Sequence, residues 1–115
     1  MIDFHPQLIN ALKTVGLPLH YEMVVNSNTK VPCITYLELS DSIRTQSDVT
    51  DISNISYQVK VWANSIKEIQ TYAPQVDRVM RDLGFSRTGA AELFDTNSTM
   101  IQKVFTYEGI NLEKY

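Results

Sequence analysis

Two segments of alternating apolar and polar residues, and the polar residues between them, constrain the fold of this chain most. The first segment is VPCITYLEL at 31–39 and the second is NISYQVKVWA at 54–63. A period of two is typical of strands with one buried face. Between them lies SDSIRTQSDVTDIS, residues 40–53, although a tight hairpin needs only about two to five loop residues. We therefore expect residues 40–53 to form a long, mobile loop or arm that serves a partner.

The second alternating segment has an apolar face and a polar face, with one exception. The apolar face carries every second residue from Ile55 to Ala63, and the other face carries polar residues and Trp62. Two interpretations of Trp62 stay open: a loop of the same chain covers it, or it is an interface aromatic that anchors another subunit. Cys33 is the only cysteine, so no intramolecular disulfide forms. Its apolar setting favours a buried thiol over a nucleophile.

Two helices are expected, a short one at residues 3–14 and a long one after Ser65. Pro6 suits the first turn of the short helix. Ser65-Ile66-Lys67-Glu68 has the form of a capping box, and apolar residues at helical spacing continue to Gly84, a typical residue after a helix end. Pro74 is expected to bend or divide this helix near Tyr72. The helix face expected to be solvated carries Lys67, Gln70, Asp77 and Arg81.

The remaining segments complete the fold prediction. Residues 19–25 alternate and predict a strand, residues 84–89 are expected to be a loop, and residues 91–95 and 99–108 are expected to form a hairpin. The order is helix, three strands, long helix, two strands. We expect one α+β domain over residues 1–115, a mainly antiparallel sheet of four to five strands. A short N-terminal helix and one long helix pack on one face of it.

The residue types that carry catalysis or bind metals are sparse. His5 and His20 are the only histidines, and their positions relative to Cys33 match no catalytic or zinc-binding spacing. We therefore expect no enzymatic activity, no catalytic residue, no metal site and no cofactor.

The net charge and the N-terminal sequence limit the classes of partner and the cellular location that we expect. Ten Lys and Arg against thirteen Asp and Glu give a formal net charge of −3, and no basic stripe indicates nucleic-acid binding. The start MIDFHPQLIN lacks the pattern of a signal peptide, and no stretch approaches the roughly 18 apolar residues of a membrane span. An intracellular protein is expected.

Two stretches together resemble a known family. VPCITYLELSDS and, after a variable polar stretch, YQVKVWANSIKEIQTYAPQVDRVMRDLGF resemble the tail completion, or tail terminator, proteins of long-tailed phages and prophages, also called tail-to-head joining proteins. The shared features are P-x-I-T-Y at 32–36, V-x-V-W-A at 59–63 and the helix beginning at Ser65. The resemblance covers roughly residues 5–108 as a pattern of hydrophobic positions, and Pro74 departs from it.

The resemblance implies a small, non-catalytic structural subunit. Such a subunit assembles as a hexameric ring that caps the tail tube, stops its polymerisation and joins the tail to the head. Its partners are copies of itself, the major tail tube protein and the head-completion or connector protein; DNA passes through the lumen without specific binding, and no membrane is involved. It acts in the host cytoplasm during assembly and then at the head–tail junction of the virion.

In that family, the region corresponding to residues 40–53 is a long loop or β-arm used in assembly. The residues expected to make inter-subunit polar contacts there are Asp41, Arg44, Gln46, Asp48 and Asp51. Three alternatives stay open: a neighbouring head-completion or minor tail protein, a small ligand-binding α+β module, and a small hydrolase.

Overall fold

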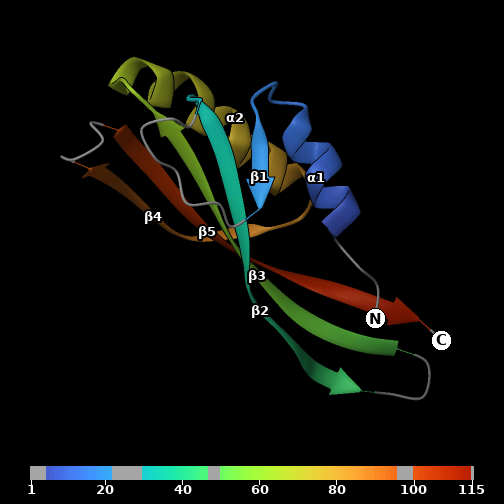
Figure 1. The fold of residues 1–115 in the computed structure, drawn as a ribbon. Coiled ribbons are helices and arrows are strands. Elements are labelled where there is room, and N and C mark those ends of the chain that lie inside the picture. Colours follow the sequence, from blue (N-terminus) through green and yellow to red (C-terminus); the bar gives the residue numbers. More distant parts are fainter. Residues whose placement is uncertain (1–4, 22–29, 47–49, 96–99, 115) are drawn as a thin grey trace.

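The computed structural model describes residues 5–21, 30–46, 50–95 and 100–114. The elements are α1 (His5–Lys13), β1 (Leu19–Tyr21), β2 (Cys33–Gln46), β3 (Thr50–Ala63), α2 (Ile66–Asp82), β4 (Ser86–Asp95) and β5 (Met100–Lys114). Their order is the predicted one: helix, three strands, long helix and two strands (Figure 1). The predicted α+β class is confirmed.

All five strands belong to one sheet, in the order β1-β2-β3-β5-β4. The short strand β1 pairs with β2 in parallel, and the other three pairings are antiparallel. Both helices contribute to the same core on one face of the sheet, since Leu8 and Leu12 of α1 and Val76 of α2 cluster with Tyr57 of β3. The sheet is therefore mainly antiparallel and covered by helices on one face.

Strand alternation places the core where the sequence predicted it. Ile55, Tyr57, Val59, Val61 and Ala63 of β3 all belong to the main core, as the period of two requires. Tyr57 is 1% exposed and stacks edge-on against Phe85, with ring centroids 5.6 Å apart.

The ends of α2 follow the predicted capping chemistry. Ser65 is the N-cap residue, and its Oγ accepts a hydrogen bond of 3.2 Å from the backbone N–H of Glu68. At the other end, Gly84 has φ +97°, its N–H donates to the carbonyl of Arg81, and the N–H of Phe85 donates to the carbonyl of Met80. These two bonds form a Schellman motif, which satisfies carbonyls that a helix end leaves free.

Pro74 was expected to bend or divide α2, and it does not divide the helix, which is continuous from Ile66 to Asp82. Proline removes one backbone bond and strains one turn. Buried side chains hold the turns on both sides of the proline: Ile69 and Ala73 precede it, and Val76 and Met80 follow it. Packing against the sheet therefore keeps the helix in one piece.

Two segments predicted as loops are strand. Residues 84–89 were expected to be a loop, yet β4 begins at Ser86. Residues 40–53 were expected to be a loop or arm, and their described part is an extension of β2 and β3: residues 41–46 pair with residues 51–55. The polar composition concealed this pairing, because a strand needs no apolar face where no helix covers it.

Candidate assembly interface

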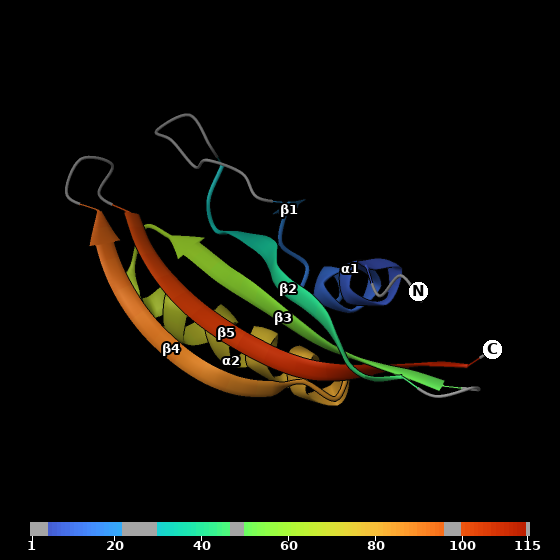
Figure 2. The ribbon, with the colours of Figure 1, turned by 90° about the horizontal axis from the view of Figure 1, so that it is seen from below.

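The extended ends of three strands form a feature that we call the arm, made of residues 40–46 of β2, 50–53 of β3 and 111–114 of β5. Residues 51–53 of β3 pair on one side with β2, and residues 50–53 pair on the other side with residues 111–114 of β5. Figure 2 shows these strand ends continuing beyond both helices. The molecule is accordingly elongated, with extents of 52 × 24 × 22 Å. The arm is thus a three-stranded ribbon without a described helix over it.

The residues predicted to make inter-subunit polar contacts fall in the arm or beside it. Asp41, Arg44 and Gln46 lie in β2, and Asp51 lies in β3. Gln46 and Asp51 are in register with each other at the far end of the strand pair. Asp48 lies outside the described residues. The backbone therefore brings the four described positions into one ribbon, and their role in assembly stays a prediction.

Trp62 is buried within the chain. Its side chain is 8% exposed and belongs to a second, smaller core with Cys33 and Met100. The indole Nε1–H donates a buried hydrogen bond of 3.0 Å to Oγ1 of Thr35. Of the two interpretations, cover from within the subunit is the one that fits, and the expectation of an exposed interface anchor is not met. Within this smaller core, Trp62 is in register with Cys33 on β2, and Val31 packs against the same cluster.

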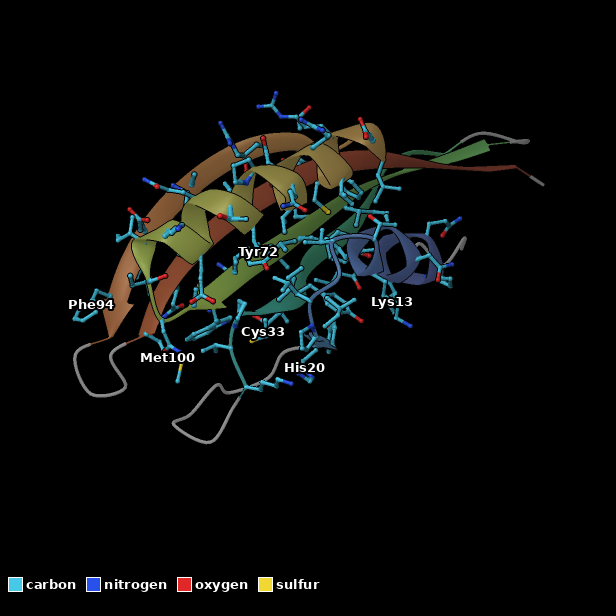
Figure 3. The ribbon with its side chains drawn as sticks, turned by 90° about the horizontal axis from the view of Figure 1, so that it is seen from above. Lys13, His20, Cys33, Tyr72, Phe94 and Met100 are labelled. Carbon is cyan, nitrogen blue, oxygen red and sulfur yellow. The ribbon has the colours of Figure 1, made fainter. Side chains whose placement is uncertain are left out.

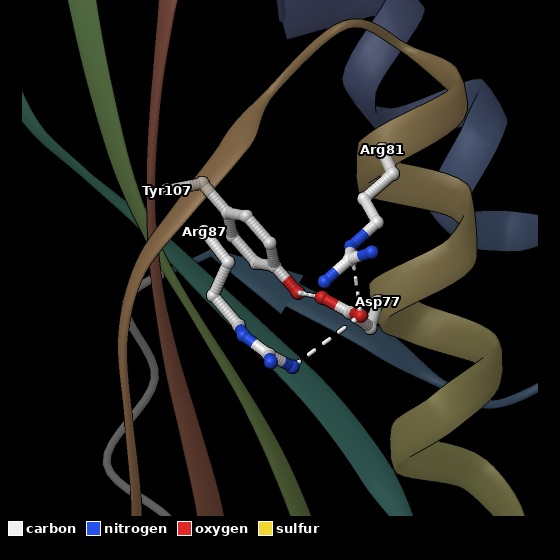
Figure 4. A network of polar contacts seen from close by, with 4 residues as sticks. All are labelled: Asp77, Arg81, Arg87 and Tyr107. Carbon is white, nitrogen blue, oxygen red and sulfur yellow. Dashed lines mark hydrogen bonds and ion pairs between the residues drawn. The ribbon is translucent and has the colours of Figure 1, made fainter.

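A polar network joins α2 to the sheet, and sequence reasoning missed it (Figure 4). Asp77 was expected to be solvated, but its side chain is only 16% exposed. Its Oδ1 accepts a hydrogen bond of 2.9 Å from the hydroxyl of Tyr107. Its Oδ2 lies 3.1 Å from Nε of Arg81 and 3.4 Å from Nη1 of Arg87. The i, i+4 spacing of Asp77 and Arg81 was the only local signal for this network.

Tyr107 is fully buried at its position on β5. Burial raises the pKa of its hydroxyl well above the usual range, and the hydrogen bond to Asp77 adds to the rise. The hydroxyl therefore stays protonated and donates to the carboxylate at all ordinary pH values. A fixed donor of this kind suits a structural contact between helix and sheet.

A groove of about 450 Å³ lies beside this network, between α2 and the strands β4 and β5. Its floor includes Phe105, and its walls carry Asp77, Arg87, Glu92 and Lys103. The guanidinium of Arg87 lies 5.6 Å and Nζ of Lys103 lies 5.8 Å from the Phe105 ring centroid. The groove mixes both charge signs, whereas small-molecule sites are mostly apolar cavities with a few convergent polar groups. It therefore gives no specific support to a ligand-binding module.

The outermost strand β4 is exposed along its described length. Every described side chain of this strand, residues 86–94, is exposed. Leu93 and Phe94 are the extreme cases, 50% and 61% exposed, and Phe94 lies near the far end of the strand (Figure 3). β4 pairs with β5 on one side, and no other described strand pairs with it. An uncovered edge strand of this length was not predicted, because its first half had been assigned to a loop.

The thiol of Cys33 does not have the character of a nucleophile. His20 on β1 is in register with Thr35 on β2, so it lies on the strand next to the one that carries Cys33. Burial, however, raises the pKa of the Cys33 thiol to about 11, and the side chain is fully buried. A thiol in this state is protonated at neutral pH and inert.

The described part of the chain also lacks two further features. No cluster of three or more His, Cys, Asp or Glu in residues 5–21, 30–46, 50–95 and 100–114 is arranged to hold a metal ion. Over the same residues, neither helix is long and apolar enough to cross a bilayer.

No protein-family model matches the chain, and no curated protein matches it.

Proposed function

We propose that this chain is a structural assembly subunit of long-tailed phage particles: it caps the tail tube, terminates its polymerisation and provides the surface that joins tail to head. The observation that carries the proposal is the arm. Three strands continue past both helices, and the strand pairing extends to Gln46–Asp51 and Thr50–Lys114, with one register shift between Ile43 and Thr45. An isolated ribbon is marginally stable in water unless another layer covers a face. A partner subunit would supply that layer.

Apolar residues in the arm support this argument. Ile52 of β3 is in register with Leu112 of β5. Cross-strand apolar pairs stabilise a sheet chiefly when their shared face is buried. No described helix lies over the arm, and another chain in an assembly would supply a covering layer. This arrangement fits a subunit that completes its structure in an assembly.

The other parts of the proposed role follow from the resemblance of the sequence. The subunit closes into a ring, with six copies as the expected number. It contacts the major tail tube protein on one side and the head-completion or connector protein on the other. A net charge of −3 suits a lumen through which DNA passes without adhering, since like charges repel. The subunit acts in the host cytoplasm and remains at the head–tail junction.

Electron microscopy of tails made with and without this chain tests the proposal. We expect overlong tubes without heads in its absence and tubes of uniform length joined to heads in its presence. Tubes of normal length joined to heads in its absence contradict the tail-capping role. Normal tubes that lack heads would instead indicate a head-completion protein.

An arm deletion links this role to the structure. Removal of residues 42–52 joins Asp41 to Ser53 and leaves Ser53-Asn54 as a two-residue loop, because Asp41 and Ile55 are already register partners. Changing these two residues to Asn-Gly favours the tight hairpin turn. We expect a folded monomer, checked by circular dichroism and thermal unfolding, that no longer caps tails. Loss of the fold, or normal capping by a folded variant, contradicts the assembly role of the arm.

A further inference from the structure

The sheet has an open edge at β4. Residues 89–95 of β4 pair regularly with residues 100–106 of β5, and the only register shift lies between Arg87 and Gly89. On the opposite side of β4 no described strand or helix pairs with the backbone. Such an edge presents unpaired N–H and C=O groups and is a template for another strand. Glu92 is its only charged residue within 89–94, and both faces around it are exposed.

Among the residues that the structure describes, the sheet has a second open edge on β2. β1 pairs only with residues 34–36 of β2. From Leu37 to Gln46, no described strand pairs with β2 on the side away from β3. Leu39 lies in this stretch and is 47% exposed. The two open edges therefore lie at opposite sides of one sheet, and each carries an exposed leucine.

The directions of the strands make these edges compatible. β2 is antiparallel to β3, β3 to β5 and β5 to β4, so β2 and β4 run in opposite directions. Leu93 is level with Cys33 through Gln102 and Trp62, close to the stretch of β2 whose outer side β1 occupies. A second copy in the same orientation, shifted along the strands by about six residues or about 20 Å, brings the open part of its β2 next to β4 as an antiparallel neighbour. Two different edges meet in this contact, and a contact between different surfaces generates a ring when the rotation closes.

We infer that the outer edge of β4 accepts the outer edge of β2 from a second copy of this chain, so that the sheet continues from subunit to subunit. The identity of the occupant as a second copy in a ring rests on the proposed function. Main-chain hydrogen bonds hold the strands in this mode, and side chains on each face give specificity. Leu93 is in register with Gln102, and Phe94 with Ile101. The two exposed side chains therefore lie on opposite faces of β4, where an added strand covers part of each.

Cysteine crosslinking tests the pairing directly. Leu93→Cys and Leu39→Cys are made as separate proteins, and each alone and their equimolar mixture are treated at high concentration with a short bismaleimide. The native Cys33 is fully buried and serves as the unreactive internal control in each protein. We expect crosslinked dimer mainly in the mixture. Dimer from Leu93→Cys alone would show two-fold pairing of β4 with itself and overturn the inference, as would the absence of dimer in the mixture.

Proline substitution blocks the edge without altering side-chain charge. Neighbouring residues of an edge strand direct their N–H groups alternately to the paired strand and outward. Of Ala90→Pro and Ala91→Pro, one therefore removes a bond to β5 and the other removes only an outward donor. We expect the variant that removes only the outward donor to keep the melting temperature of the parent protein. In this variant, the yield of crosslinked dimer between Leu39→Cys and Leu93→Cys partners should fall at least tenfold. Full crosslinking by that folded variant overturns the inference.

The two proposals fail in different ways. Rings on tail tubes without the Leu39–Leu93 crosslink leave the tail-capping role intact and exclude this pairing. Tubes of normal length and with heads in the absence of the chain exclude the tail-capping role. A mixture-specific crosslink in that case still establishes pairing between copies.

Discussion

The hydroxyl of Tyr107 on β5 donates a hydrogen bond of 2.9 Å to Oδ1 of Asp77 on α2. The other carboxylate oxygen of Asp77 lies within 3.4 Å of two arginines, Arg81 on its own helix and Arg87 on β4. One carboxylate thus connects the long helix to two strands. Since Tyr107 is fully buried, its hydrogen bond to Asp77 is the contact of this network that water weakens least.

We expect Tyr107→Phe to lower the free energy of unfolding by about 1–2 kcal/mol, because it removes a buried bond to a charged acceptor. Urea unfolding followed by circular dichroism measures this change. Tyr72→Phe is the matched control: Tyr72 lies half-buried on α2, and no hydrogen bond of its hydroxyl is found among the described residues. We expect the control to change stability by less than about 0.5 kcal/mol. Equal losses in the two variants contradict the assigned bond.

The bond between Trp62 and Thr35 gives a second prediction. Thr35→Val keeps the shape of the side chain but leaves the buried indole N–H of Trp62 without its acceptor, so we expect a loss of about 1–3 kcal/mol. Trp62→Phe removes the donor as well. The double variant should therefore lose less than the sum of the single variants, as residues in direct contact do. Additive losses would show that the two side chains do not interact.

Local patterns predicted much of this fold. The capping box at Ser65, the glycine after α2 and the alternation of β3 depend on residues close together in the sequence, and each has the predicted structure. The Asp77–Tyr107 bond joins residues 30 positions apart. Nothing in the sequence near Asp77 specifies which strand lies above it, so a polar residue on a helix was assigned to solvent.

The arm shows where side-chain patterns fail to predict the structure. Polarity in residues 40–53 is typical of a loop, yet the backbone of the described part is paired strand. Its third strand comes from residues 111–114, about 60 positions away in the sequence. Because Asp51, Ile52 and Ser53 of β3 each have a backbone partner on both sides, main-chain bonds rather than side-chain alternation specify the strand there. A pattern of side chains therefore cannot predict it.

Gly109 on β5 gives a prediction on packing. A Cβ at this position would lie 2.7 Å from Cδ1 of Phe85, and Phe85 is itself only 6% exposed and packed on Tyr57. We expect Gly109→Ala to lower the free energy of unfolding by about 1–3 kcal/mol, the usual cost of overpacking. Gly89→Ala is the matched control, because no atom lies within 4 Å of a Cβ there. A larger loss in Gly89→Ala than in Gly109→Ala contradicts this account.

Alkaline pH should weaken the fold first through Cys33. Burial raises the pKa of its thiol from 9.0 to about 11 in the folded chain. A raised folded-state pKa gives a contribution that is fully present below the unfolded value and is lost as pH rises toward the folded value. Stability should therefore begin to fall above pH 9, by at most about 1.4 kcal/mol per pH unit for a single group. Urea unfolding at closely spaced pH values measures this slope.

The interval from pH 9 to 10 separates Cys33 from the buried tyrosines, because the pKa of Tyr107 and that of Tyr36 are raised from an ordinary value of 10.0. Cys33→Ala removes the titrating thiol and leaves a small apolar side chain at the same place. We expect this variant to be less stable at pH 7, because it loses buried contacts, but to show a flatter pH dependence between pH 9 and 10. A slope equal to that of the parent chain would mean that another group causes the alkaline loss.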